Sequence, residues 1–376
     1  MVSTVVLRRL ERHENGNTPM KVLQERKIPT PCVSNHASNL MELDNGDLLC
    51  VWFGGSMEGS SDISIYMARY DRGRDVWLAP EKMSDDATRS EQNPALFRHP
   101  AGELWLLYTA QDKADQGTAV VRLRRSADNG LTWSKTVDLI ARPGTFIRHA
   151  PVVNPSGLLL LPVWHSDMRN AFGDDSSLVQ VSADGGRTWD IVPVPGSRGC
   201  VHMNILGNCQ VAFFRRRQSD FIFRSVSEDS GLSWSVPAAT TLPNNNSSIQ
   251  ARSLSDGRLA IVYNHISAAG RASESAVPPW IKDRQAFLAA CGTIENGAIW
   301  GVPRHPLILA TSTDLGLTWR EDLVLEADAT LRSSHDERGA FVGDYSYPSI
   351  IQSNDGLVHV SYSYLRDYIK HVTLAA

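Results

Sequence analysis

The sequence lacks the features that would assign it to a membrane or to nucleic acid. It has no run of about 18 consecutive apolar residues that could span a bilayer. Its formal net charge is −4, and the triplet 215–217 is its longest run of Lys and Arg. We therefore expect neither a membrane nor a nucleic-acid partner.

Disulfide and metal signatures are also missing. The five cysteines are an odd number and form no C-x-x-C pair, and they are Cys32, Cys50, Cys200, Cys209 and Cys291. Buried free thiols in a reducing compartment are the expected state. The N-terminus shows no basic segment followed by an apolar one, so we expect a cytoplasmic protein. No H-x-H or H-E-x-x-H spacing occurs, and no metal or other cofactor is expected.

One eight-residue pattern occurs four times. The copies are SADNGLTW at 126–133, SADGGRTW at 182–189, SEDSGLSW at 227–234 and STDLGLTW at 312–319. In each copy the Asp is expected to cap backbone N–H groups, the Gly to adopt φ > 0 and the Trp to be buried. The pattern predicts a structural turn between two strands. A degenerate copy, YDRGRDVW, lies at 70–77.

A longer repeat contains these turns. An apolar strand, a Gly turn and a strand ending in an aromatic residue recur six times, with turns at Gly46, Gly102, Gly157, Gly207, Gly257 and Gly356. The usual spacing of about fifty residues accommodates the four strands of a propeller blade. The sequence predicts an all-β, single-domain, six-bladed β-propeller over 1–376, with residues 267–303 inserted in the fifth blade. An N-terminal strand at 3–10 is expected to complete the sixth blade and close the ring.

Together with the segment YPSIIQSNDG at 347–356, these boxes and units resemble the sialidase (neuraminidase) superfamily of bacterial Asp-box propellers over essentially the whole chain. The resemblance implies an exo-glycosidase for an acidic sugar. In that superfamily an arginine triad grips the substrate carboxylate, an Asp is the acid/base, and a Tyr paired with a Glu is the nucleophile. The boxes are specific for the fold but weak for function.

The resemblance assigns the nucleophile to Tyr347, nine residues before Gly356. Tyr345 lies two residues away and is expected on the same strand face, where it could contact substrate. Arg304 resembles the third arginine of the triad. Arg215 resembles the second, although Arg216 and Arg217 compete for that position.

The acid/base position corresponds to Asp62, with Glu58 as its neighbouring rival. Two other positions depart from the pattern: His36 stands where the first arginine is expected, and His202 stands where the Glu partner is expected. Because an imidazole can take a proton from a phenol, a histidine could replace that Glu.

Several polar residues are predicted to open inner strands and to gather around one central funnel with Tyr347. They are His36, Gln92, Asn93, Arg148, His149 and His202. At least one of the histidines is expected to act chemically, and the amides to bind hydroxyl groups.

Three functions fit these residues. The first is hydrolysis of an acidic glycoside. The second is a lyase reaction, in which Arg holds a uronate carboxylate while His and Tyr perform β-elimination. The third is non-catalytic glycan or protein binding. Residues 267–303 could be a lid, an oligomer contact or a plain surface insertion.

Overall fold

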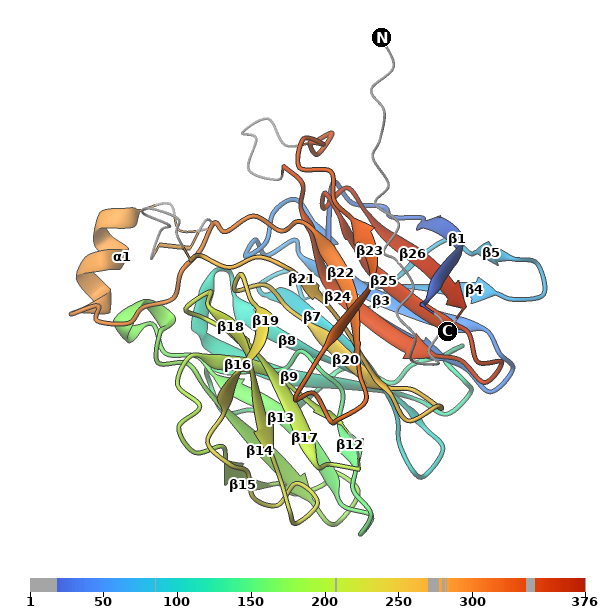
Figure 1. The fold of residues 1–376 in the computed structure, drawn as a ribbon, viewed down its shortest axis with the longest axis horizontal. Coiled ribbons are helices and arrows are strands. Elements are labelled where there is room, and N and C mark those ends of the chain that lie inside the picture. Colours follow the sequence, from blue (N-terminus) through green and yellow to red (C-terminus); the bar gives the residue numbers. More distant parts are fainter. Residues whose placement is uncertain are drawn as a thin grey trace.

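A computed structural model describes residues 19–84, 86–206, 208–269, 277–278, 281, 283–335 and 342–375. Their strands form six antiparallel sheets arranged around a common axis (Figure 1). The predicted six-bladed β-propeller is therefore confirmed. None of the described helices is long and apolar enough to cross a membrane.

The blades follow one another along the chain, each running from its innermost to its outermost strand. Blade 1 has β2 (Ser34–Glu42), β3 (Leu48–Gly55), β4 (Ser64–Asp71) and β5 (Val76–Trp77), with β6 (Glu81–Lys82) also paired to β4. Blade 2 has β7 (Ser90–Arg98), β8 (Leu104–Asp112), β9 (Asp115–Ser126) and β10 (Val137–Ile140). Blade 3 has β11 (Thr145–Phe146), β12 (Val152–Val153), β13 (Leu159–His165), β14 (Ser176–Ser182) and β15 (Asp190–Pro193).

The second half of the ring repeats this order. Blade 4 has β16 (Cys200–Leu206), β17 (Val211–Arg216), β18 (Phe221–Val226) and β19 (Ala238–Pro243). Blade 5 has β20 (Gln250–Ser253), β21 (Leu259–Asn264), β22 (Leu307–Ser312) and β23 (Arg320–Glu326). Blade 6 has β24 (Tyr345–Gln352), β25 (Val358–Tyr364), β26 (Tyr368–Ala375) and, outermost, β1 (Lys21–Ile28).

Strand β1 closes the ring. It pairs antiparallel with β26, from Lys21 opposite Ala375 to Ile28 opposite Ile369. The predicted closure by an N-terminal strand is therefore confirmed, but the strand that makes it lies at 21–28. The segment 3–10, which was predicted to do so, lies outside the described residues. The pairing covers an edge of β26 that would otherwise be open.

The core consists of apolar clusters between adjacent blades. Residues of blades 4 and 5, for example, share one cluster that includes Phe213, Ile261 and Tyr263, and Trp319 packs against it. The box tryptophans Trp133, Trp189 and Trp234 make the equivalent contacts between earlier blades. Each box therefore fastens its blade to the preceding one.

The box geometry agrees with the prediction. In the copy at 312–319, Asp314 Oδ1 accepts hydrogen bonds from the backbone N–H groups of Leu317 (3.0 Å) and Thr318 (2.9 Å). Gly316 has φ +80° and approaches Phe213 of the preceding blade. Glycine is required here both by the backbone angle and by the close approach.

A long connection joins β21 to β22 in blade 5, between Asn264 and Leu307. It contains α1 (Arg284–Cys291), which projects from the side of the ring in Figure 1. Phe287 of α1 stacks on Phe172 of the 3-10 segment η1 (Arg169–Phe172), with ring centroids 5.8 Å apart. Trp300, further along the same connection, belongs to this small cluster.

Candidate functional site at the propeller axis

Four inner strands contain the same irregularity. In β2, β7, β16 and β24 the register with the next strand shifts by one residue, after His36, Gln92, Val201 and Ser346. The residue that follows each shift is left-handed: Ala37 (φ 59°), Asn93 (φ 52°), His202 (φ 54°) and Tyr347 (φ 54°). Such a conformation costs about 1–3 kcal/mol for a residue other than glycine and is concentrated at functional sites.

Three of these four residues line a cavity at the axis, here called the central cavity. The space left free between its lining atoms is about 30 Å³. The lining residues are Glu58, Gln92, Asn93, Gln116, Phe146, Trp164, His202, Arg215, Arg217, Trp300 and Tyr347. Every blade contributes, since Trp300 comes from the β21–β22 connection of blade 5.

Tyr347 has polar and aromatic neighbours on several sides. Arg215 Nη1 donates a hydrogen bond of 2.5 Å to its phenol oxygen. The ring of His36 lies 4.2 Å from the Tyr347 ring, centroid to centroid, and that of His202 lies 5.8 Å away. The guanidinium carbons of Arg148, Arg215 and Arg304 lie 5.5, 5.6 and 5.6 Å from the ring centroid.

Both histidines are held as neutral imidazoles in the same tautomer, with the proton on Nδ1. His202 Nε2 lies 3.3 Å from Arg215 Nη1, and His36 Nε2 lies 3.3 Å from Arg366 Nη2. Because arginine can only donate, each Nε2 accepts, and each Nδ1–H donates to a serine hydroxyl, that of Ser248 or Ser363. Burial, followed by nearby arginines, holds the pKa of both imidazoles well below the ordinary histidine value. Both imidazoles are therefore uncharged at neutral pH, with the Nε2 lone pair directed at an arginine.

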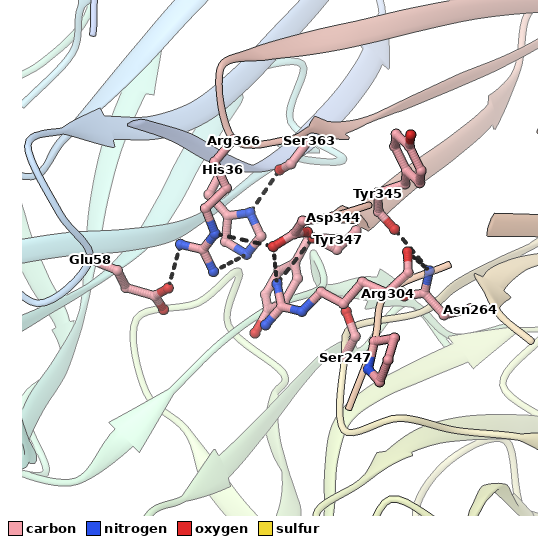
Figure 2. Close-up of polar contacts among 12 residues, drawn as sticks. His36, Glu58, Ser247, Asn264, Arg304, Asp344, Tyr345, Tyr347, Ser363 and Arg366 are labelled. Carbon is pink, nitrogen blue, oxygen red and sulfur yellow. Dashed lines mark hydrogen bonds and ion pairs between the residues drawn. The ribbon is translucent and has the colours of Figure 1, made fainter. Parts of the chain in front are cut away.

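Three guanidinium groups at the site have carboxylate partners. Arg217 pairs with Asp175, Arg304 with Asp344, and Arg366 with Glu58 and Asp344. Figure 2 shows the Arg366 side chain between Glu58 and Asp344, with one nitrogen directed at His36. The chain places Arg366 there through a tight turn in which Leu365 (φ 54°) and Arg366 (φ 60°) are both left-handed.

Two buried arginines differ from these three. Among the described residues, neither Arg148 nor Arg215 has a carboxylate within 4.0 Å. Burial lowers the pKa of each guanidinium to about 10, so both are charged at neutral pH. Buried charge without a counter-ion is unfavourable. Because Arg215 lines the central cavity, an anionic ligand there would supply the missing charge.

An aromatic wall faces these charges. Phe146 and Trp164 stack with ring centroids 4.9 Å apart, and Trp300 covers Arg215 and Arg217 at 5.8 and 5.1 Å. The indole nitrogen of Trp164 is buried and has no hydrogen-bond partner in the described chain. The cavity thus combines cationic donors with flat apolar surfaces, a composition suited to a sugar ring bearing a carboxylate.

The structure brings many of the predicted residues together. Tyr347, His202, Arg215, Asn93, Gln92 and Glu58 line the central cavity, while His36 and Arg304 lie against the Tyr347 ring. Arg217, the rival of Arg215, also lines it. Arg216 points elsewhere, with its guanidinium over Phe223.

The expected position of Tyr345 is wrong. The left-handed backbone at Tyr347 breaks strand alternation, so Tyr345 packs in the cluster between blades 5 and 6 and its hydroxyl donates to Asp328 O. Figure 2 shows the two rings pointing apart. Asp62 is not among the cavity-lining residues either. Both its oxygens accept hydrogen bonds from Ser56, so it closes a turn on the protein surface.

Arg148 and His149 are also displaced from their predicted place. They lie between β11 and β12 and do not line the central cavity. His149 is buried, and burial holds its pKa well below the ordinary value. His36 and His202 do not occupy equivalent positions in their strands. The residue of β2 that matches His202 is Ala37, which follows His36.

Sequence reasoning missed Arg366, Phe146, Trp164, Trp300 and Gln116. Most of these lie in or beside the connection between the second and third strands of a blade. Glu58 and Arg217 occupy the same connection in blades 1 and 4. A search for polar and aromatic residues in this connection of each repeat would have found most of the set.

Known proteins resemble this chain in sequence and fold. A family model described as a BNR repeat-like domain matches residues 46–360. The chain belongs to this family. Among curated proteins, the BNR repeat-like chain is 26% identical over 147 residues to a sialidase of Clostridium perfringens; the match covers 35% of this chain and 37% of that protein.

Solved structures share the fold of this BNR repeat-like propeller at low identity. A Dyadobacter fermentans protein of unknown function has a TM-score of 0.68 at 15% identity, covering 95% of this chain and 99% of that one. A Hadza microbial sialidase has a TM-score of 0.66 at 15% identity, covering 91% and 66%. The Trypanosoma rangeli sialidase has a TM-score of 0.61 at 14% identity, covering 91% and 55%.

Proposed function

We propose that the protein is a glycoside hydrolase for a sugar that carries a carboxylate, with Tyr347 as its nucleophile. The observation that carries the proposal is the Arg215 guanidinium, which lines the central cavity, lacks a carboxylate partner among the described residues, and donates to the Tyr347 phenol oxygen at 2.5 Å. A substrate carboxylate would compensate this charge and bring the sugar to the phenol. The sialidases among the fold relatives support the same reaction class.

The proposed reaction uses three groups of the central cavity. The phenol oxygen of Tyr347 forms a bond to the anomeric carbon while its proton passes to His202 Nε2, the neutral acceptor held beside Arg215. The bond between the anomeric carbon and the leaving oxygen breaks, and Glu58 gives that oxygen a proton. This step requires the Glu58 carboxyl group to be protonated and released from Arg366 in the substrate complex. Water then attacks the anomeric carbon and Glu58 takes its proton. The bond between that carbon and the Tyr347 oxygen breaks, and the phenol regains its proton from His202.

Glu58 is proposed as the acid in preference to Asp62. Glu58 lines the central cavity, whereas both oxygens of Asp62 are engaged by Ser56. Glu58→Gln should therefore reduce turnover strongly on a substrate with an alkyl leaving group and less on one with an acidic aryl leaving group, which needs little protonation. Asp62→Asn is the matched control and should leave both rates nearly unchanged. The reverse pattern would assign the role to Asp62.

The decisive experiment is a screen of aryl glycosides of sialic acids and uronic acids, followed by product analysis. We expect release of the aryl group from at least one acidic glycoside, a saturated sugar product, and no release from the neutral analogue that lacks the carboxylate. Arg215→Lys should raise KM, because one ammonium nitrogen cannot keep the contact to Tyr347 and also present a second nitrogen to the carboxylate. A product with a new C=C absorbance would instead indicate elimination. Binding of acidic sugars without turnover would also overturn the proposal.

A further inference from the structure

We propose that Arg148 is a positioning residue that holds Tyr347 and His202 in their reactive arrangement and does not itself bind substrate. The proposal rests on the function proposed above. It reassigns an arginine that the sequence placed among the substrate-binding residues.

The first observation is that Arg148 forms hydrogen bonds with the backbone of the segment that contains Tyr347. Its Nη2 donates to the carbonyl oxygens of Tyr347 (3.2 Å), Pro348 (3.2 Å) and Ser38 (3.0 Å). Two of these carbonyls belong to the register shift where Tyr347 is left-handed. One side chain from blade 3 thus fixes the strained segment of blade 6 against blade 1.

The second observation is a link from Arg148 to His202. Arg148 Nε donates to Ser248 Oγ at 3.1 Å, and His202 Nδ1 lies 3.0 Å from the same oxygen. The hydroxyl oxygen can accept both hydrogen bonds, which keeps the proton of His202 on Nδ1 and leaves Nε2 as an acceptor. Arg148 therefore positions His202 as well as Tyr347.

The third observation separates Arg148 from substrate. Its side chain is 1% exposed and is not among the residues lining the central cavity, whereas Arg215 lines it. The Arg148 guanidinium instead lies 5.5 Å from the centroid of the Tyr347 ring. Without this support the left-handed segment can relax, and a displacement of about 1 Å at a reacting atom can lower the rate about 10²-fold.

Arg148→Lys tests the proposal because it keeps the positive charge, but its single nitrogen cannot replace both Nε and Nη2 of the guanidinium. Arg258→Lys is the matched control: Arg258 is also buried, but it pairs with Asp256 away from the axis. For Arg148→Lys we expect kcat to fall about 10²-fold with KM changed by less than about threefold, and no change in the control. A raised KM with unchanged kcat would mean that Arg148 binds substrate. Unchanged kcat and KM would mean that its role is only structural.

Ser248→Ala provides a second test that retains the buried charge. It removes the link to His202 only, so kcat should fall about tenfold and the acidic limb of its pH profile should move, since the imidazole is no longer held in one tautomer. An unchanged rate and profile would contradict the proposal.

A measurement without turnover distinguishes this proposal from the proposed function. If the wild type hydrolyses no acidic glycoside, the proposed function fails. The NMR resonance of isotope-labelled Tyr347, assigned with Tyr347→Phe, should still shift in Arg148→Lys and stay in place in Arg258→Lys. An unshifted resonance in Arg148→Lys would overturn the positioning role.

Discussion

The contact between an Asp-box glycine and the preceding blade can be measured with a pair of glycine substitutions in blade 5. Gly316 and Gly257 both have positive φ, +80° and +87°. A Cβ at Gly316 would lie 2.3 Å from Cζ and 2.7 Å from Cε1 of Phe213, while a Cβ at Gly257 would meet nothing within 4 Å. Gly316→Ala therefore adds a steric clash to the backbone strain that both substitutions share.

The two contributions have different sizes. Placing alanine at positive φ costs roughly 1–2 kcal/mol at either position. Phe213 is fully buried in the cluster between blades 4 and 5, so it has little room to move, and overpacking adds about 1–3 kcal/mol. We expect Gly257→Ala to lower the free energy of unfolding by about 1–2 kcal/mol and Gly316→Ala by about 2–5 kcal/mol.

Urea unfolding of the two variants and the wild type, followed by tryptophan fluorescence, gives the comparison. The difference in midpoint at unchanged slope reports the steric contribution. If both variants lose the same stability, the box glycine serves the turn alone and does not fasten one blade to the next.

Three further outcomes are expected. Tyr347→Phe should reduce turnover by at least about 10³-fold and lower the free energy of unfolding by only about 1.5–3 kcal/mol, because one hydrogen bond from a charged donor is lost. Substantial activity in this variant would exclude the phenol as nucleophile. Burial, followed by Arg72, lowers the pKa of His359 to about 4, so the unfolded chain takes up a proton that the folded one does not. His359 should contribute up to about 3 kcal/mol to the loss of stability between about pH 6.5 and pH 4, in addition to the other buried histidines. In urea unfolding, His359→Gln should therefore reduce the pH dependence by this share. Phe287→Ala should undock α1 and lower its local stability by about 3–5 kcal/mol. Hydrogen exchange over residues 284–300 should become faster, and KM should rise because Trp300 belongs to the same cluster. Unchanged exchange would show that α1 stays docked without this ring.

The fold could be predicted because its signals are local and repeated. The capping Asp, the glycine with positive φ and the tryptophan all lie within eight residues, and each copy reinforces the others. The strand that closes the ring was harder to locate. Lys21–Ile28 alternates weakly between exposed and buried positions, because it is the outermost strand of blade 6 and pairs along one edge only.

The site was only partly predictable, since the alternation of side chains between the two faces of a strand fails at Tyr347. The resemblance to sialidases assigned Tyr347 by its offset from Gly356, but the left-handed backbone there turns Tyr345 away from the cavity. Arg366 lies 330 residues from His36 in sequence. No spacing rule links two residues that meet only because the ring closes.

The pairing of β1 with β26 also bears on how the chain folds during synthesis. Lys21 emerges from the ribosome long before its partner Ala375, so the sixth sheet cannot be complete until β26 has been translated. Blades 1 to 5 contain only strands that are consecutive in the sequence, so each of these sheets can form in turn as it appears. Until β26 has been translated, β1 has no partner. We therefore expect the pairing of β1 with β26 to be the slow step and the earlier sheets to form folding intermediates.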